Sequence, residues 1–299
     1  MEYKNLPGID LHIHSNASDG TLFPWEILAR ARRLNLKAIA ITDHDTVEGC
    51  RAAFQREIPS YLKFLTGVEI SAAPPFEFSI SGSFHILGYG IDLDDPGLNR
   101  TLNKLQLARK NRNPKIIGKL RQMGIDISLD ELREEFGEKP LGRPHIAQLM
   151  VKKNYVTSID DAFDYYIGKN KPAYVDKFRI VCSEAIDMIS EAGGVAVLAH
   201  PYLLKMNRGD RLEDLLIHLK SLGLVGLEVY YPDHPPEATD LYIRLAKRHD
   251  LLMTGGTDFH GSLNPEIEMG SGNGSFYVPY RLYEELARYL LQADRKCAL

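Results

Sequence analysis

The 299-residue sequence has only three cysteines, one tryptophan and no long apolar run. The cysteines, Cys50, Cys182 and Cys297, are odd in number and far apart, which argues against a disulfide framework and favours the reducing cytoplasm. The start, Met1–Pro7, is short and polar, so we expect no signal peptide, and no stretch is apolar enough to span a membrane. A net charge of −4 provides no basic field, so we expect neither an extended nucleic-acid duplex nor a membrane as partner.

What the sequence does contain is an alternation of apolar strand-like segments with helical ones. At 44% hydrophobic and 25% charged, its composition is that of a soluble globular protein. The alternation predicts an α/β fold with a mostly parallel sheet: a closed barrel of seven units, or alternatively an open doubly wound sheet. The predicted strands are Ile9–Ile13, Lys37–Thr42, Phe64–Ile70, Phe84–Ile91, Gly194–Ala199, Val225–Tyr230 and Leu251–Gly255, with a short edge strand at Phe276–Pro279.

The alternation stops between residues 96 and 174, where the pattern is helical. We expect these residues to form an insertion in a barrel made of residues 1–95 and 175–299. Pro114 predicts a break between two helices, because the residue before a proline is pushed away from helical geometry. Ser128 and Glu131 predict the capping box of a further helix, and Ser158 caps another.

The charges of this insertion are segregated. Every charged residue from Arg100 to Arg121 is basic, whereas acidic residues dominate from Asp126 to Glu138. One interpretation is a pair of solvated helix faces, which is the usual meaning of a charge run. The other is that the basic helix overhangs a site for a phosphorylated substrate.

Metal-ligating residue types recur at the ends of the predicted strands, where barrel enzymes carry their chemistry. His12 and His14 are two residues apart on a strand and so share one face. His85 is the exception, since it stands near the start of its segment. The three histidines at positions 218, 234 and 249 are expected at the surface. The candidate ligands are His12, His14, Asp19, His44, Glu69, His85, His200, Asp258 and His260.

These residues together predict a metal centre. Burying so many imidazoles and carboxylates without metal would leave uncompensated polar groups and like charges close together. The set exceeds the needs of one tetrahedral ion, so we expect at least two ions. Nitrogen and oxygen ligands without thiolate suit Zn, Mn or Fe.

The ordered motifs HIHSNASDG, TDHDT, GVEIS, FHILGYG, AHP and GTDFHG together resemble the PHP (polymerase and histidinol phosphatase) family. The GRPH turn and the helical insertion resemble its small phosphoesterase branch, which acts on nucleotide 3',5'-bisphosphates and short oligoribonucleotides. The resemblance covers nearly the whole chain. It implies a distorted (β/α)7 TIM-like barrel with a helical insertion and a centre of two or three divalent ions.

Residue by residue, the resemblance also implies how the ligands divide. His12, His14, Glu69 and Asp258 would hold one ion. A second ion would lie between Asp19, His44 and His260, and a third between Glu69, His85 and His200, with Glu69 bridging. Asp43 or Asp45, on either side of His44, could orient its ring by accepting the other N–H, or could simply cap the turn.

Such a centre predicts hydrolysis of a phosphate ester by a hydroxide that bridges two ions, with no covalent intermediate. Arg143 is a candidate clamp for phosphate oxygens, and His145 could bind phosphate or protonate the leaving oxygen. The alternative for this Arg-Pro-His turn is a helix start with proline in its first turn. Arg112 and Lys115 are candidates for a second phosphate.

Three other functions are compatible with parts of this pattern. An amidohydrolase-type enzyme also begins with His-x-His on its first strand, but no lysine stands at a middle strand end to bridge two ions. Histidinol phosphate is another conceivable substrate. A non-catalytic, metal-bound module is the alternative outside enzymes. The sequence does not indicate an oligomeric state.

Overall fold

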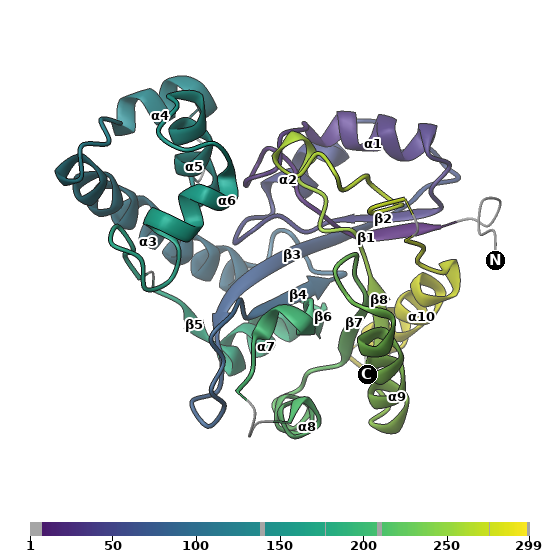
Figure 1. Ribbon diagram of the computed structural model, residues 1–299. Helices are drawn as coiled ribbons and strands as arrows, with labels where there is room; N and C mark the ends of the chain where they lie inside the picture. The colour runs from purple at the N-terminus through teal and green to yellow at the C-terminus, as the bar shows by residue number, and fades with distance from the viewer. Residues whose placement is uncertain (1–7, 138–140, 177, 208–210, 275, 298–299) are drawn as a thin grey trace.

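The strands form one curved, nearly closed barrel-like sheet in the computed structural model, which describes residues 8–137, 141–176, 178–207, 211–274 and 276–297 (Figure 1). Two predictions concern parts outside this description, namely the segment Met1–Pro7 and the side chain of Cys297. Along the sheet the strand order is β1-β2-β3-β4-β6-β7-β8, and β5 pairs with β3. The strands are β1 (Ile9–Ile13), β2 (Ala38–Ile41), β3 (Lys63–Ala73), β4 (His85–Tyr89), β5 (Ile180–Val181), β6 (Val195–Leu198), β7 (Gly226–Tyr230) and β8 (Leu252–Gly255).

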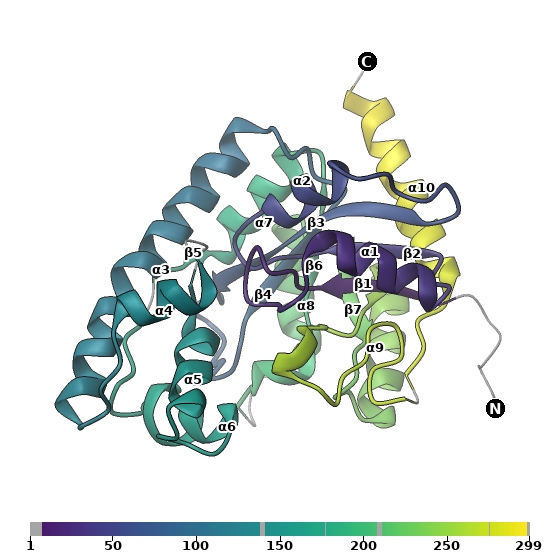
Figure 2. The same cartoon turned by 90° about the horizontal axis from the view of Figure 1, so that it is seen from above.

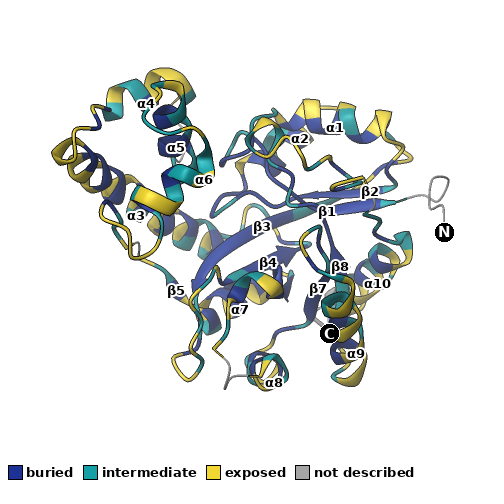
Figure 3. Cartoon of the chain, viewed as in Figure 1, coloured by how far each residue is buried: buried dark blue, intermediate teal, exposed yellow. Residues whose placement is uncertain are grey.

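Helices surround this sheet. Figure 3 shows that the strands are buried along most of their length, whereas the helices expose their outer faces. Among the described residues, no helix is long and apolar enough to cross a membrane. The helices are α1 (Pro24–Arg33), α2 (Glu48–Phe54), α3 (Pro96–Gln122), α4 (Leu129–Phe136), α5 (Arg143–Lys152), α6 (Ile159–Ala162), the π-helix η1 (Phe163–Ile167), α7 (Cys182–Glu191), the 3-10 helix η2 (Pro201–Leu204), α8 (Leu212–Ser221), α9 (Pro236–Arg248), the 3-10 helix η3 (Gly261–Leu263) and α10 (Tyr280–Cys297).

The predicted distorted barrel is confirmed, but its sheet is more mixed than the alternation indicated. β4 runs antiparallel to both of its neighbours, β3 and β6, while the other neighbouring pairs along the sheet are parallel. The chain returns from β3 to β4 without a crossover helix, and such a return gives an antiparallel pair. Ser71 near the end of β3 is in register with His85 at the start of β4. The predicted start of this strand, at Phe84, is therefore one residue from the observed start. The antiparallel direction explains why His85 lies at the beginning of its strand and not at the end.

The barrel closes through β1 and the segment after β8. Ile13 forms an isolated parallel bridge with Phe259, whose carbonyl accepts a hydrogen bond from the backbone N–H of His14 at 2.9 Å. The Asp10 carboxylate adds side-chain bonds, accepting from the N–H and the hydroxyl of Thr257 at 2.9 and 2.6 Å. The predicted edge strand at Phe276–Pro279 is a single bridge between Pro279 and Gly8.

Separate apolar clusters hold the helices on the sheet. Ile186 and Ile189 of α7 pack in one cluster with Val68 and Ile70 of β3. In a second cluster, α1 and α2 cover β2 on another part of the barrel wall. A third cluster joins apolar side chains of β1, β4 and β6 to Leu282 and Leu286 of α10.

The helices between residues 96 and 174 gather beside the barrel, as Figure 2 shows from above. α4, α5, α6 and the second half of α3 share an apolar cluster of their own, centred on residues such as Ile116, Leu120 and Ile146. The first half of α3 instead packs on the barrel through Leu98, Leu102 and Leu105. The assignment of residues 96–174 as an inserted unit remains our proposal, with α3 as the connection.

The predicted break at Pro114 is wrong: α3 runs without interruption through it. A proline inside a helix removes one backbone hydrogen bond. Apolar contacts on both sides of Pro114, from Leu105 and from Ile116, hold the helix in one piece. The predicted capping box is confirmed, with Ser128 Oγ accepting from the Glu131 N–H at 3.1 Å and Glu131 Oε2 accepting from the Ser128 N–H at 2.8 Å.

The close approach of β8 to β1 generates a first prediction. A Cβ atom on Gly256 would lie 2.3 Å from the backbone nitrogen of His12, so Gly256→Ala must push the two strands apart. We expect a loss of unfolding free energy of about 2 kcal/mol or more, measured by urea unfolding. Gly118→Ala is the control, because no atom lies within 4 Å of its Cβ in α3; it should gain about 0.5–1 kcal/mol. Equal stability of the two variants would contradict this account of closure.

Candidate metal centre

The structure brings together all nine residues that were predicted as metal ligands. His12 lies in β1 and Glu69 in the second half of β3, and His85 is the first residue of β4. The others lie in the loops that follow β1, β2, β6 and β8: His14, Asp19, His44, His200, Asp258 and His260. The convergence follows from the barrel, in which the carboxyl ends of parallel strands open on one face. The antiparallel β4 contributes from its first residue for the same reason.

Glu69 lies at the middle of this set. Its Oε1 is 2.7 Å from His85 Nδ1 and 2.9 Å from His200 Nε2. Its Oε2 is 2.9 Å from His44 Nδ1 and 3.2 Å from His14 Nε2. Each carboxylate oxygen thus faces a different pair of imidazoles, which is the geometry of a group that can bridge neighbouring ions.

A first group of ligand atoms is formed by His12, His14, Glu69 and Asp258. Asp258 Oδ1 lies 3.4 Å from His12 Nε2 and 3.0 Å from His14 Nε2. This is the set that the family resemblance implies for one ion.

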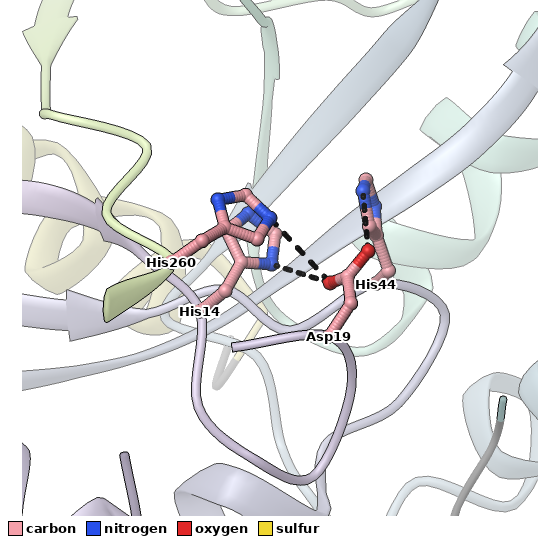
Figure 4. Close-up of side chains that lie close together, drawn as sticks. All are labelled: His14, Asp19, His44 and His260. Atoms are coloured by element: carbon pink, nitrogen blue, oxygen red, sulfur yellow. Dashed lines mark ion pairs between the residues drawn. The ribbon is translucent and has the colours of Figure 1, made fainter. Parts of the chain in front are cut away.

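A second group is formed by His14, Asp19, His44 and His260, shown in Figure 4. Asp19 lies between the three rings: its Oδ1 is 3.7 Å from His14 Nδ1 and 3.5 Å from His260 Nε2, and its Oδ2 is 3.9 Å from His44 Nε2. The geometry adds His14 to the residues implied for this ion. The third group is His44, Glu69 and His85, beside which His200 Nε2 lies 3.3 Å from His85 Nδ1.

The buried ligand atoms fit a metal centre because they lie close together but lack hydrogen bonds to the described residues. Seven of them are buried and have no hydrogen-bond partner among the described residues: His12 Nε2, His14 Nε2, Asp19 Oδ1, His44 Nδ1, Glu69 Oε2, His200 Nδ1 and Asp258 Oδ1. All but His200 Nδ1 point into the groups just described. Buried polar atoms are almost always paired, so this concentration points to cations between them. Imidazole and carboxylate ligands without thiolate match Zn, Mn or Fe.

The electrostatics of the cluster favour the charged forms of Glu69 and His14 but the neutral form of His85. Burial alone would raise the pKa of Glu69, but His44, His85 and His12 outweigh it and hold that pKa well below its usual value. Burial lowers the pKa of His14, yet Asp258 and Glu69 outweigh it and raise that pKa to about 10. Burial lowers the pKa of His85 to about 4, in spite of Glu69. A metal ion must therefore displace a proton from His14, whereas His85 offers a neutral ring.

Sequence reasoning missed Glu228, which supports two of the ligands. Its Oε1 lies 2.9 Å from His12 Nδ1, and its Oε2 accepts a hydrogen bond from the backbone N–H of His200 at 2.7 Å. With His12 Nδ1 as donor, Nε2 presents its lone pair to the first group. The available signal was a single carboxylate in the apolar strand Val225–Tyr230. Tyr231 was also missed: its hydroxyl donates to Asp258 Oδ2 at 3.1 Å.

Of the two alternatives for the acidic residues beside His44, the contacts do not support the one in which they orient its ring. Both ring nitrogens of His44 face the carboxylates of Glu69 and Asp19 instead. Asp43 shapes the loop after β1 by accepting from the hydroxyls of Ser15 and Ser18, each at 2.6 Å.

Asp45 lies in an ion pair that links the helices beside the barrel to the centre. It accepts from Arg109 Nη2 of α3 at 2.6 Å and from the backbone N–H of Ser71 at 2.9 Å. Its neighbour His44 belongs to the metal-ligand groups, so the first half of α3 is tied to the loop that carries a ligand.

A cavity of about 450 Å³ adjoins the cluster at His85. Arg143 lines it, with its guanidinium over the rings of Phe163 and Tyr174 and Nη1 donating to the Ile167 carbonyl at 3.0 Å. The other cationic residues of its lining are Lys169, Arg179 and Lys205. We call it the cationic cavity.

The other three predicted substrate-binding residues lie in different surroundings. His145 is buried in the first turn of α5, where its Nδ1 accepts from the Gly142 N–H at 3.0 Å and its ring meets the edge of Phe136. Arg112 is buried in α3, only 4% exposed, with Nη2 donating to Asn113. Lys115 is exposed on the same helix, and no described contact joins it to the cavity.

One prediction for the remaining histidines is wrong. His234 is buried, with Nδ1 2.9 Å from the Val229 carbonyl and its ring packed against Tyr231 and Tyr242. The prolines around it indicated a surface loop, but the contacts that bury its ring are tertiary ones.

Comparison with known proteins relates the whole chain to phosphoesterases. A family model described as PHP domain matches residues 10–155. The chain is 33% identical over 295 residues to the 3',5'-nucleoside bisphosphate phosphatase of Chromobacterium violaceum, covering 97% of this chain and 100% of that protein. It is 31% identical over 264 residues to the 5'-3' exoribonuclease Rnm of Escherichia coli, covering 87% of each. A crystal structure from Bifidobacterium adolescentis, provisionally named a metal-dependent phosphoesterase, has a TM-score of 0.84 at 31% identity and covers 94% of this chain and 96% of its own.

The position of Glu228 predicts an effect on metal retention. The carboxylate of Glu228 accepts hydrogen bonds from the His12 ring and from the His200 backbone. In Glu228→Gln an amide N–H₂ group replaces one of the two acceptors, so one of these hydrogen bonds is lost and the histidine concerned is no longer held in place. We expect manganese affinity to fall about 10- to 100-fold, measured by metal analysis after equilibrium dialysis against a chelator series. Glu213→Gln is the matched control, because Glu213 also faces a histidine, His249, at 3.0 Å but outside the cluster. Unchanged affinity in Glu228→Gln would show that this support is dispensable.

Proposed function

The chain belongs to the PHP domain family, and we propose on that premise that it hydrolyses phosphate esters of a nucleotide 3',5'-bisphosphate or of a short RNA end. The family predicted from the ordered motifs is confirmed by relatives that span nearly all of the chain, and with it the activity of a metal-dependent phosphoesterase. The observation that carries the proposal is the set of unsatisfied ligand atoms around Glu69, next to a cavity lined by cations.

We infer that the cluster holds two or three divalent ions. The groups around Asp258 and around Asp19 would each hold one, and Glu69 with His85 and His200 would hold a third. When bound, such ions lower the pKa of water and neutralise charge on the phosphate oxygens. Mn, Zn and Fe all suit these ligands, and metal analysis of the purified protein distinguishes them.

A second phosphate is favoured by the arginines around the cationic cavity. Burial, together with the charges of Arg109 and Arg143, lowers the pKa of the Arg112 guanidinium to about 9. Burial also lowers the pKa of Arg143. Among the described residues Arg112 has no ion pair with a carboxylate, unlike Arg109 and Arg179. A doubly charged phosphate is the ligand that relieves such crowding of cations.

The roles within this site follow from the contacts. Arg143 lines the cavity directly, so we assign it to phosphate binding, with Arg112 as the neighbour whose charge adds to the field. For His145, the hydrogen bond to the Gly142 N–H favours holding the turn that presents Arg143 over touching the reacting atoms. Lys115 stays a prediction of the sequence alone.

The competing functions have less support. An amidohydrolase-type centre would use a lysine to bridge its ions, whereas here the carboxylate of Glu69 lies between the imidazoles of His44 and His85. Histidinol phosphate carries a single phosphate and would leave the arginine cluster without an anion. A non-catalytic module would not require a cation-lined cavity beside the metal ligands.

The proposal is tested by phosphate release from a substrate panel. The manganese-loaded protein is given adenosine 3',5'-bisphosphate, a short 5'-phosphorylated RNA, histidinol phosphate and an aryl phosphate, with His12→Ala as the control. We expect selective turnover of the bisphosphate or the RNA, abolished in His12→Ala and by chelation. Turnover of histidinol phosphate alone, or none at all with metal bound, would refute the proposal.

A further prediction concerns Arg143. Arg143→Ala removes charge-assisted hydrogen bonds to a phosphate, so KM for the bisphosphate should rise about 10- to 100-fold while metal content is unchanged. Arg121→Ala, in the exposed last turn of α3, is the control and should leave KM as it is. Loss of metal in Arg143→Ala would instead assign this turn a structural role.

A further inference from the structure

A second cavity, of about 600 Å³, borders the metal centre, and its lining differs in kind from that of the cationic cavity. The helix η2 lies between the two: Tyr202 lines the second cavity, while Leu203 and Lys205 line the first. We call the second cavity the aromatic cavity. Its lining comes from η2, from the end of β7 and the start of α9, and from the segment before α10.

The walls of the aromatic cavity are rings without cations. Five aromatic side chains line it, and the described residues of its lining include neither lysine nor arginine. Prolines at four further lining positions stiffen the loops that carry the rings. The five are Tyr202, Tyr230, Tyr231, Phe276 and Tyr277. A phosphate would find no positive charge here, whereas a flat, neutral ring would find several surfaces to stack on.

Tyr231 connects the aromatic cavity to the metal centre. Tyr231 is its inner wall: the hydroxyl donates to Asp258 Oδ2 at 3.1 Å, and the ring centroid is 5.5 Å from that of His200. His234 continues the row, 5.2 Å from Tyr231 and 6.3 Å from Tyr202 between ring centroids. A ligand with its phosphate at the cluster could therefore extend a ring along this wall.

We propose that the aromatic cavity binds the nucleobase of the substrate. This inference rests on the proposed nucleotide phosphoesterase function and gives it a specific substrate contact. The two cavities divide a nucleotide by its chemistry: the cationic cavity takes a phosphate and the aromatic cavity takes the uncharged base. Stacking tolerates any base, since every base has a π-face, and the lining also includes the polar side chains of Asp233 and Thr239.

Tyr202 provides the cleanest test, because it is 51% exposed and its removal leaves no buried void. Tyr202→Ala is compared with Tyr202→Phe, which keeps the ring, and with Tyr289→Ala, an exposed tyrosine of α10 outside both cavities. The first measurement is binding of adenosine, a base without phosphate, by isothermal titration calorimetry and saturation-transfer NMR. The second is KM for adenosine 3',5'-bisphosphate and for its abasic analogue, in which hydrogen replaces the base.

We expect adenosine to bind the wild-type protein about tenfold more tightly than Tyr202→Ala, with Tyr202→Phe and Tyr289→Ala close to wild type. KM for the bisphosphate should rise by a similar factor in Tyr202→Ala, and KM for the abasic analogue much less, at equal metal content. No adenosine binding, or equal losses on both substrates, would overturn the proposal. A third outcome separates this proposal from the proposed function. If adenosine binding depends on Tyr202 but the protein hydrolyses neither the bisphosphate nor its abasic analogue, the base site is supported and the proposed phosphoesterase substrate is refuted.

Discussion

The buried carboxylate of Glu69 is the group on which the rest of this structure depends. It is within 3.5 Å of five imidazoles, those of His12, His14, His44, His85 and His200. A carboxylate buried alone would cost several kcal/mol. Three of the rings are buried and those of His44 and His85 are partly buried, so they too are stabilised by the anion. The groups stabilise one another only if the ends of several strands meet at one point. The electrostatic stabilisation of the site therefore depends on the direction of the strands and on the closure of the barrel.

Parallel and antiparallel strands bring side chains to this point from opposite ends. The parallel strands deliver ligands from their carboxyl ends, as barrels generally do. The antiparallel β4 delivers His85 from its amino end, because its register places that residue beside Ser71 at the end of β3. Closure then brings Asp258 and His260, from the last strand end, back to the histidines of the first strand. Asp10 fixes that seam through Thr257, and Gly256 permits the close approach.

The surroundings of the cluster separate charge from apolar surface. On one side, α5 and the segment around Arg179 supply guanidinium groups to the cationic cavity, and Arg109 ties α3 to the loop around His44 through Asp45. On the other side of η2, the loops after β7 and β8 supply rings without cations. A nucleotide has the same two parts, a charged phosphate and an uncharged flat base. Because the two cavities correspond to the two parts of a nucleotide, a nucleotide is a better candidate substrate than a simple aryl phosphate.

The sequence by itself determined the fold class, the family and the set of histidines and carboxylates that gather around Glu69, since strand periodicity and ordered motifs are local patterns that survive without coordinates. His12, His14 and the strand-end motifs were recognisable in this way, and so was the Ser128 cap, which is a contact over three residues. Only the tertiary structure decided the direction of β4, the continuity of α3 through Pro114 and the burial of His234, because each depends on packing against distant segments. It also decided which atoms support the ligands: Glu228 stands 216 residues from His12, and Asp45 meets Arg109 across 64 residues. Contacts at such separations arise from the closure of the barrel and from the packing of α3 on it, which no local pattern encodes.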